Sequence, residues 1–204
     1  MQRDIGKLTR KQQAENTKKR LMDTIMELMN TTGYHELTID QICQKAGVSK
    51  GTFYHYFQSK REILLHICQA ANDRIIAQLS FDETRSARYL FDQYLRTLVE
   101  MTYAEGYAGE ARMLIALLTS GAKETYNSIR PQTDYVVRIF RHGQARGEIP
   151  PSLDVDALNE LITGAIQGFV ARWSIAHGET DLLAQLQTAF APIWQMVSLC
   201  SMSR

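Results

Sequence analysis

Two helix-start signals stand close together in the first third of the chain, with a glycine between them. Thr38 opens a T-x-x-Q capping box, in which two side chains satisfy unpaired backbone donors at the start of a helix. Gly47 is the residue type that ends a helix in a left-handed conformation, and Ser49 is a good cap for the helix that follows. These signals predict two short helices, 39–46 and 50–57, joined by a tight turn.

Apolar spacing predicts helices along the rest of the chain as well. A first helix is expected over 17–32, because apolar residues recur there at helical spacing and a glycine follows as a stop. Ser59 and Glu62 repeat the capping-box pattern, so a fourth helix is expected to run from there to about residue 79. Glycines and prolines divide the remainder into expected helices at 86–105, 109–128, 131–146, 154–177 and 181–199. No alternating β pattern is present, and the predicted fold is all-α with about nine helices.

Composition favours a globular chain. Hydrophobic residues make up 45% and charged residues 22% of the 204, which are ordinary values. No apolar run approaches the roughly 18 to 20 residues that span a bilayer, and the N-terminus has no apolar export segment, so a cytoplasmic protein without a membrane partner is expected. Cys43, Cys68 and Cys200 are odd in number and lack disulfide or metal spacing, which predicts free thiols and no metal site.

The net charge of +1 hides an asymmetry between the two parts of the chain. Up to His66 there are eleven Lys and Arg against seven acids, a balance of +4, so the remainder carries −3. A basic head on a mildly acidic body is typical of a polyanion-binding module joined to a second domain. Solvated basic helix faces are common too, so charge alone leaves both interpretations open.

Two short helices joined by a glycine-containing turn and braced by a preceding helix form a helix-turn-helix, whose second helix enters the DNA major groove. Phe53 and Phe57, four residues apart, share one face and are expected to pack in the core with Ile42, Leu28 and Ile63.

The other faces of this second helix carry Lys50, Gly51, Thr52, Tyr54 and His55. Lysine can reach a guanine edge or a phosphate, threonine a phosphate or a thymine methyl, tyrosine a phosphate, and histidine either target. A glycine in so short a helix costs about 1 kcal/mol relative to alanine, which indicates that close approach matters there.

This segment resembles the DNA-binding domain of the TetR family of bacterial transcriptional regulators. The resemblance covers 17–67 and rests on AGVSKGTFYHYF, with TIDQI before it and SKREIL after it. It implies a homodimer whose second helices read successive major-groove faces of a pseudo-palindromic DNA operator. The candidate DNA-binding residues are Thr38, Ser49, Lys50, Gly51, Thr52, Tyr54, His55, Tyr56 and Lys60. Cys43 stands where the family usually has alanine and is expected to fill the same small buried site.

Two points within this region stay open. Tyr56 is ambiguous and can brace its helix while touching a phosphate. The basic arm before the first helix can contact DNA or remain a solvated tail. The expected domains are a basic arm at 1–15, a helix-turn-helix domain at 16–66 and a ligand-binding and dimerisation domain at 67–204.

The last two expected helices are apolar on two faces and therefore need two partners. A second copy of the chain is the expected partner of one face, forming a four-helix interface about a twofold axis, as the resemblance also implies. The candidate interface residues are Leu161, Gly164, Gly168, Ile175, Leu186, Phe190, Ile193, Trp194 and Val197. Full burial inside one subunit is the alternative.

Aromatic and methionine side chains are frequent between these regions. The resemblance implies a pocket there for a small-molecule effector, and such a lining suits an apolar or aromatic molecule. The candidate pocket residues are Tyr94, Met101, Leu117, Tyr126, Phe169 and Trp173. The same stripe is also what an ordinary hydrophobic core contains.

The function that follows is a homodimeric repressor released from its operator by a small effector. A regulator or activator that needs no ligand and acts through a protein partner is the alternative. An enzyme is not expected, because the sequence holds no G-x-S-x-G, H-E-x-x-H, P-loop or C-x-x-C motif, and no cofactor is implied.

Overall fold

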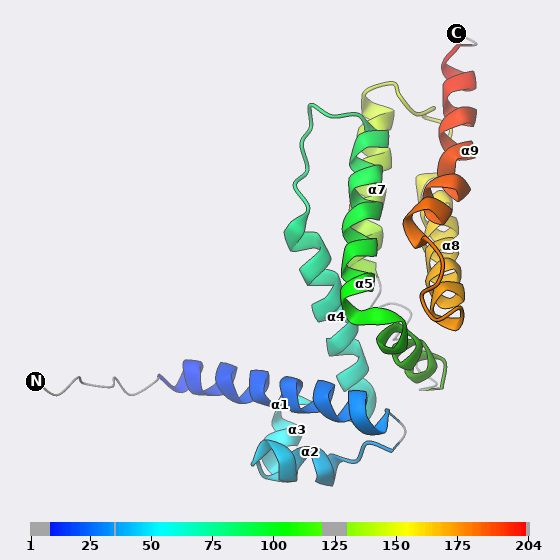
Figure 1. Ribbon diagram of the computed structural model, residues 1–204. Helices are drawn as coiled ribbons and strands as arrows, with labels where there is room; N and C mark the ends of the chain where they lie inside the picture. The colour runs from blue at the N-terminus through cyan, green and yellow to red at the C-terminus, as the bar shows by residue number, and fades with distance from the viewer. Residues whose placement is uncertain (1–8, 35, 120–129, 203–204) are drawn as a thin grey trace, which may run out of the picture. The chain divides into compact units, whose positions relative to one another are not determined.

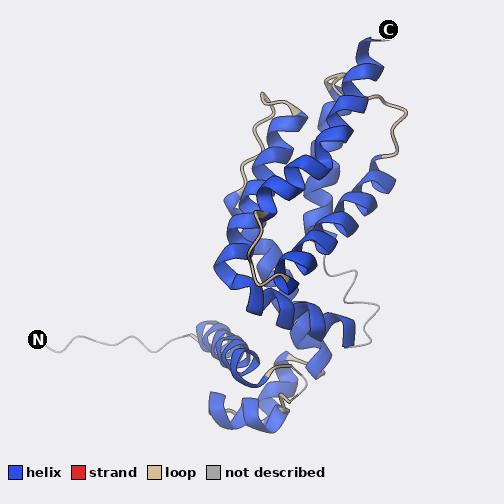
Figure 2. Cartoon of the chain, turned by 45° about the vertical axis from the view of Figure 1, so that its right-hand side comes forward, coloured by secondary structure: helices blue, strands red, loops and turns tan. Residues whose placement is uncertain are grey.

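The computed structural model describes residues 9–34, 36–119 and 130–202 (Figure 1). Within these ranges a few side chains near 61, 107–133 and 196–202 are not described. Every regular element in the described part of the chain is a helix (Figure 2), so the predicted all-α fold is confirmed. None of the described helices combines the length and hydropathy that crossing a bilayer requires.

Eight helices carry labels in the described residues. They are α1 (Arg10–Thr32), α2 (Ile39–Ala46), α3 (Lys50–Tyr56), α4 (Lys60–Gln78), α5 (Ala87–Thr119), α7 (Arg130–Ala145), α8 (Val155–Ile175) and α9 (Leu182–Met202). Gly106 has non-helical backbone angles (φ 74°, ψ 158°) inside α5, at the break that the sequence predicts between two helices. The predicted number of about nine agrees with the structure once α5 is divided at this kink.

The chain divides into two compact units, Met1–Ile67 and Cys68–Arg204, which are called unit 1 and unit 2 below. In unit 1, α2 packs against both α1 and α3. In unit 2, α5 packs against α7, α8 and α9, and α8 contacts both α7 and α9.

Capping bonds fix the ends of the helices in unit 1. Thr38 and Gln41 form the predicted capping box, with the Thr38 N–H donating to Gln41 Oε1 (2.8 Å) and the Gln41 N–H donating to Thr38 Oγ1 (3.2 Å). Gly47 ends α2 in the left-handed conformation (φ 63°, ψ 42°), and the Val48 N–H donates to the Cys43 carbonyl (3.0 Å). This is the Schellman arrangement, which closes the turn between α2 and α3.

The first helix begins earlier than predicted. Thr9 and Gln12 form a further T-x-x-Q capping box, so α1 starts at Arg10 and not near residue 17. The segment expected as an arm at 1–15 is therefore helical from Arg10 onward. The exposed basic residues Lys18 and Lys19 lie on the same helix.

The core of unit 1 collects apolar side chains from each of its helices. Phe53 of α3 and Phe57, which directly follows this helix, are fully buried, as are Ile42 and Ile63, while Leu28 is half-buried. Burying one such side chain contributes about 1.5 to 3 kcal/mol, so these residues hold the short α3 helix, which would not be stable alone.

An aromatic cluster fills the centre of unit 2. The Phe91 ring lies within 6 Å of Phe140, Phe190 and Trp194, and Phe140 stacks on Trp194 with centroids 5.5 Å apart and planes 8° from parallel. These rings come from α5, α7 and α9. Offset and edge-to-face ring pairs add to the stabilisation from burial, so this cluster ties the three helices together.

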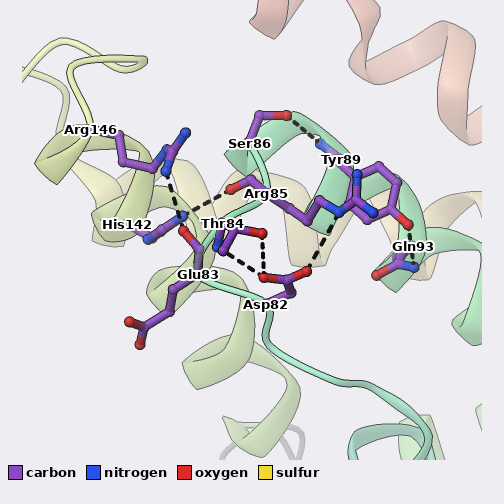
Figure 3. A network of polar contacts seen from close by, with 9 residues as sticks. All are labelled: Asp82, Glu83, Thr84, Arg85, Ser86, Tyr89, Gln93, His142 and Arg146. Carbon is purple, nitrogen blue, oxygen red and sulfur yellow. Dashed lines mark hydrogen bonds and ion pairs between the residues drawn. The ribbon is translucent and has the colours of Figure 1, made fainter.

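The segment between α4 and α5 is non-helical, as predicted, and is hydrogen-bonded to the end of α7 (Figure 3). Arg146 donates to the Glu83 carbonyl (3.2 Å), and His142 Nε2 lies 3.0 Å from the Arg85 carbonyl. Asp82 accepts from the Thr84 hydroxyl (2.6 Å) and N–H (2.9 Å), and these bonds lower the pKa of the Asp82 carboxyl. The connection into α5 is thus held in one conformation within unit 2.

Candidate nucleic-acid interface

Helix α3 has one buried side and one open side. Phe53 and Phe57 point into the core of unit 1 with ring centroids 5.5 Å apart. Tyr54 is 51% exposed and touches Phe53 only edge-on, and His55 is also exposed. The side chains predicted to face a partner therefore lie outside the core, while those predicted to anchor the helix lie inside it.

Lys50, the first residue of α3, makes an ion pair that was not predicted from the sequence. Its Nζ lies 2.6 Å from Asp40 Oδ1, and both side chains are well exposed. The hydrogen bond and charge of Asp40 raise the pKa of the Lys50 ammonium. The two residues are ten apart in sequence on different helices, so helical spacing gives no signal for the pair.

Three small polar candidates are engaged in helix capping. Ser49 Oγ accepts from the Thr52 N–H (3.0 Å) and lies 2.9 Å from the Thr52 hydroxyl, while Thr38 caps α2. Ser49 and Thr38 are exposed and Thr52 is half-buried, so their hydroxyls remain near the surface. Capping positions the N-termini of α2 and α3, whose unpaired N–H groups suit an anionic partner.

Gly51 has space around it within unit 1. A β-carbon placed there would meet only Ser49 Oγ, at 3.7 Å. Its φ is ordinary for a helix, so neither crowding inside the chain nor backbone geometry requires glycine at this position. A requirement for close approach by a partner outside the chain is consistent with this.

Tyr56 braces the domain. Its ring is half-buried, and its hydroxyl donates to the Ala14 carbonyl of α1 (3.1 Å). This bond joins the end of α3 to the early turns of α1, which lie before the helix predicted over 17–32. The structure therefore shows the predicted bracing contact of Tyr56.

Lys60 lies at the N-terminus of α4, with its Nζ 4.5 Å from the centre of the Tyr34 ring. Burial lowers the pKa of the Lys60 ammonium, and the nearby Glu36 opposes that shift. Such a cation–π contact holds the ammonium at the start of a helix, where anions also bind. Burial likewise raises the pKa of the Cys43 thiol, in accordance with its predicted role as a small buried side chain.

The fold and this surface define a helix-turn-helix protein of the transcription-factor class. Residues 21–67 match the model for bacterial regulatory proteins of the tetR family, and this match supports the TetR family and a role as a transcriptional regulator for this chain.

Known relatives extend the similarity beyond the matched segment. The HTH-type transcriptional regulator UidR of Escherichia coli K12 is 24% identical over 165 residues, covering 78% of this chain and 82% of the relative. The fatty acid metabolism regulator protein of Bacillus subtilis 168 is 24% identical over 172 residues, covering 80% and 87%. A crystal structure of the transcriptional regulator FadR from Bacillus subtilis with stearoyl-CoA shares the fold, with a TM-score of 0.70 at 22% identity over 88% of this chain and 97% of that one.

The expected dimer residues separate into two groups. On α8, Leu161 is 66% and Ile175 is 75% exposed, and β-carbons at Gly164 and Gly168 would meet no atom within 4 Å. These four positions lie on one face of α8 and form a stripe that is open within the described part of the chain.

The α9 candidates are mostly not available at the surface of unit 2. Leu186, Phe190, Ile193 and Trp194 are buried in the unit's own core. Phe190 and Trp194 belong to the aromatic cluster, so this apolar face of α9 packs inside unit 2. The side chain of Val197 lies outside the described residues.

Four of the six candidate pocket residues have described side chains, and all four belong to the core of unit 2 or pack against it. Tyr94 and Trp173 are buried core residues, and Met101 and Phe169 are half-buried against that core. Tyr126 and the side chain of Leu117 lie outside the described residues.

Two hollows occur elsewhere in the described part of unit 2. One, of about 260 Å³, is lined by Arg88, Asp92, Leu95, Gln187, Phe190, Ala191 and Trp194. The other is an open groove of about 510 Å³ lined by Phe81, Glu83, Asp134, Val137, Arg138, Arg141 and His142. None of the residues predicted for the effector pocket lines either of these two hollows.

Proposed function

We propose that this regulator is a homodimeric repressor that binds a pseudo-palindromic DNA operator through α3 and leaves it when a small molecule binds unit 2. DNA binding is supported by the difference between the two sides of α3. Phe53 and Phe57 are buried, while Lys50, Tyr54 and His55 are exposed. A helix anchored on one side and polar on the other suits major-groove binding.

Four substitutions test the DNA surface. Tyr54→Ala and Lys60→Ala are expected to weaken binding across many sequences, because both side chains are assigned to phosphates. Lys60→Ala should also reduce the slope of log affinity against log salt by about 1. Changing Lys50 or His55 to alanine should alter which base is preferred. Fluorescence anisotropy with labelled duplexes measures the DNA affinity of all four variants. Unchanged binding by every variant would contradict the assignment of α3 as the helix that reads DNA.

The homodimer is supported by the open stripe on α8. Leu161 and Ile175 are large apolar side chains exposed on one helix face, and the glycines between them allow close approach of another helix. Leu161→Glu places a charge in this face and is expected to shift sedimentation from dimer to monomer. Glu160→Gln, an exposed neighbour in sequence, is the matched control.

An effector site in unit 2 is supported by two unpaired polar atoms on α8. Asn159 Oδ1 and Trp173 Nε1 are buried, and neither has a hydrogen-bond partner among the described residues. A buried polar atom without a partner is costly, and a polar group on a bound molecule would satisfy it. The stearoyl-CoA complex of the Bacillus subtilis regulator makes acyl-CoA the first class of molecule to test.

The effector must bind the DNA-free state more tightly than the DNA-bound state, since equal affinity for both would change nothing. Stearoyl-CoA titrated into the protein–operator complex tests this, with free coenzyme A as the control. A fall in anisotropy with stearoyl-CoA, but not with free coenzyme A, supports an acyl-CoA effector. Thermal-shift screening then extends the search to apolar and aromatic molecules, and hits that never alter DNA affinity contradict release by a ligand.

One observation favours a second candidate, a regulator that needs no small molecule. Tyr94 and Trp173, which were expected to line the pocket, are packed into the core of unit 2. A filled unit 2 would act through a protein partner instead, and DNA affinity would then be unaffected by every molecule in the screen.

A further inference from the structure

Asp40 places a carboxylate beside the first residue of α3. It is the second residue of α2, and its Oδ1 lies 2.6 Å from Lys50 Nζ, so the pair bridges the N-terminal ends of the two helices of the helix-turn-helix. The side chains are 71% and 62% exposed, so both are open to a partner.

Folding stability does not explain the pair, because ion pairs this exposed contribute little to it. Phosphate binding does not explain it either, since an acid beside the lysine repels the DNA backbone and cancels its charge. A function that requires a donor and an acceptor side by side does explain it.

We propose that Asp40 is a specificity-determining residue and that Asp40 and Lys50 together read one G·C base pair in each half of the operator. This inference rests on the proposed role of α3 as the helix that reads DNA.

The edge of a G·C pair in the major groove matches the two side chains. Guanine presents two adjacent acceptors, N7 and O6, and cytosine presents the N4 amino donor next to them. The Lys50 ammonium has only donors and can span the two guanine acceptors, while the Asp40 carboxylate accepts from the cytosine amino group.

The spacing of the two groups agrees with that edge. Guanine O6 and cytosine N4 are joined by an ordinary hydrogen bond, so they lie about 2.9 Å apart, close to the 2.6 Å between Lys50 Nζ and Asp40 Oδ1. An A·T pair presents acceptor, donor and acceptor in that order. It would place the carboxylate against thymine O4, which is an acceptor, and the ammonium against the adenine amino group. A reversed C·G pair reverses the order and is excluded for the same reason.

The experiment selects duplexes from a randomised pool with the full-length protein and with its Asp40→Ala, Lys50→Ala and double variants. Glu27→Ala is the matched control, because Glu27 forms an equally short, exposed ion pair with Lys45 that joins α1 to α2 and does not involve α3. Both acid removals raise the net charge by one, so both are expected to strengthen binding to unrelated DNA. Circular dichroism confirms that each variant is folded.

The expected result is one G·C position per half-site whose preference over A·T, about 5- to 150-fold in the parent, is lost with Asp40→Ala and with Lys50→Ala. The double variant should lose no more than either single one, and Glu27→Ala should keep the preference. If Asp40→Ala keeps every base preference of the parent while Lys50→Ala does not, the assignment to Asp40 is overturned. If the parent protein selects no sequence at all, the proposed DNA-binding function fails instead.

Discussion

Tyr54 in unit 1 and the central aromatic residues of unit 2 lie in different surroundings. Unit 1 exposes Tyr54 on the open side of α3, beside a buried Phe53. Unit 2 turns Phe91, Phe140 and Trp194 into one central cluster. The difference teaches that an aromatic residue on a helix indicates function only when its neighbours at helical spacing already fill the core.

The first prediction breaks the cluster of unit 2. Phe91→Ala removes a ring that contacts four other aromatic rings and is expected to lower the free energy of unfolding by about 3 to 5 kcal/mol. Tyr54→Ala, on the exposed side of α3, should change it by less than about 1 kcal/mol. Both tryptophans of the chain lie in unit 2, so urea unfolding followed by tryptophan fluorescence reports that unit. A cost below 1 kcal/mol for Phe91→Ala would contradict the cluster as the core.

The second prediction makes one substitution in both units. A β-carbon at Gly143 of α7 would lie 2.6 Å from Ile149 Cδ1 and 2.8 Å from Ala87 Cβ, so Gly143→Ala should destabilise unit 2 by about 1 to 3 kcal/mol. Gly51→Ala meets no such contact, and better helix propensity should stabilise unit 1 by up to about 1 kcal/mol.

The same Gly51→Ala variant is expected to bind its operator more weakly than the parent, because the added methyl group faces the partner and not the core. Thermal unfolding by circular dichroism and a DNA titration on one preparation measure both effects. A variant that is more stable and binds DNA equally well would show that close approach is not the reason for glycine.

The third prediction concerns the brace between α3 and α1. Tyr56→Phe removes only the hydroxyl that donates to the Ala14 carbonyl, and it should cost about 0.5 to 1.5 kcal/mol. Hydrogen exchange should speed up in the early turns of α1 and leave unit 2 unchanged. Faster exchange spread evenly over both units would contradict a local brace.

The fourth prediction is a pH dependence confined to unit 1. Burial lowers the pKa of His66, with Lys18 adding to the shift and Glu62 opposing it, and the His66 ring packs edge-on against Phe57. Between the lowered pKa and the ordinary value near 6.5, the unfolded chain binds a proton that the folded chain does not.

Stability from this group is therefore complete above about pH 6.5 and is lost as the pH falls through that window. Urea unfolding from pH 8 to pH 5, followed by circular dichroism, should show the loss in the parent and a flatter profile in His66→Gln. An equally steep profile in the variant would assign the pH dependence to other groups.

Much of unit 1 could be predicted from sequence because local signals specify it. The capping box at Thr38, the turn at Gly47 and the spacing of Phe53 and Phe57 each act within a few residues. The early start of α1 carried the same T-x-x-Q signal at Thr9, so it could have been found. The Lys50–Asp40 pair could not, since it joins two helices through long side chains.

In unit 2, the sequence did not predict which helix faces are buried. On α8 the expected stripe is open at Leu161 and Ile175, while on α9 Leu186 and Trp194 are buried in the unit itself. Both helices are apolar on more than one face, and sequence periodicity does not tell which face meets the chain's own core. That choice depends on partners distant in sequence, such as Phe140 for Trp194.

The most direct test of the account is a DNA titration of the variant with Lys50, Tyr54 and His55 all changed to alanine, on the duplex that the parent selects. These residues lie on the open side of α3, so the variant should fold normally and lose at least about a hundredfold in operator affinity. Parent-like affinity in a folded variant would contradict the claim that the open side of α3 reads DNA.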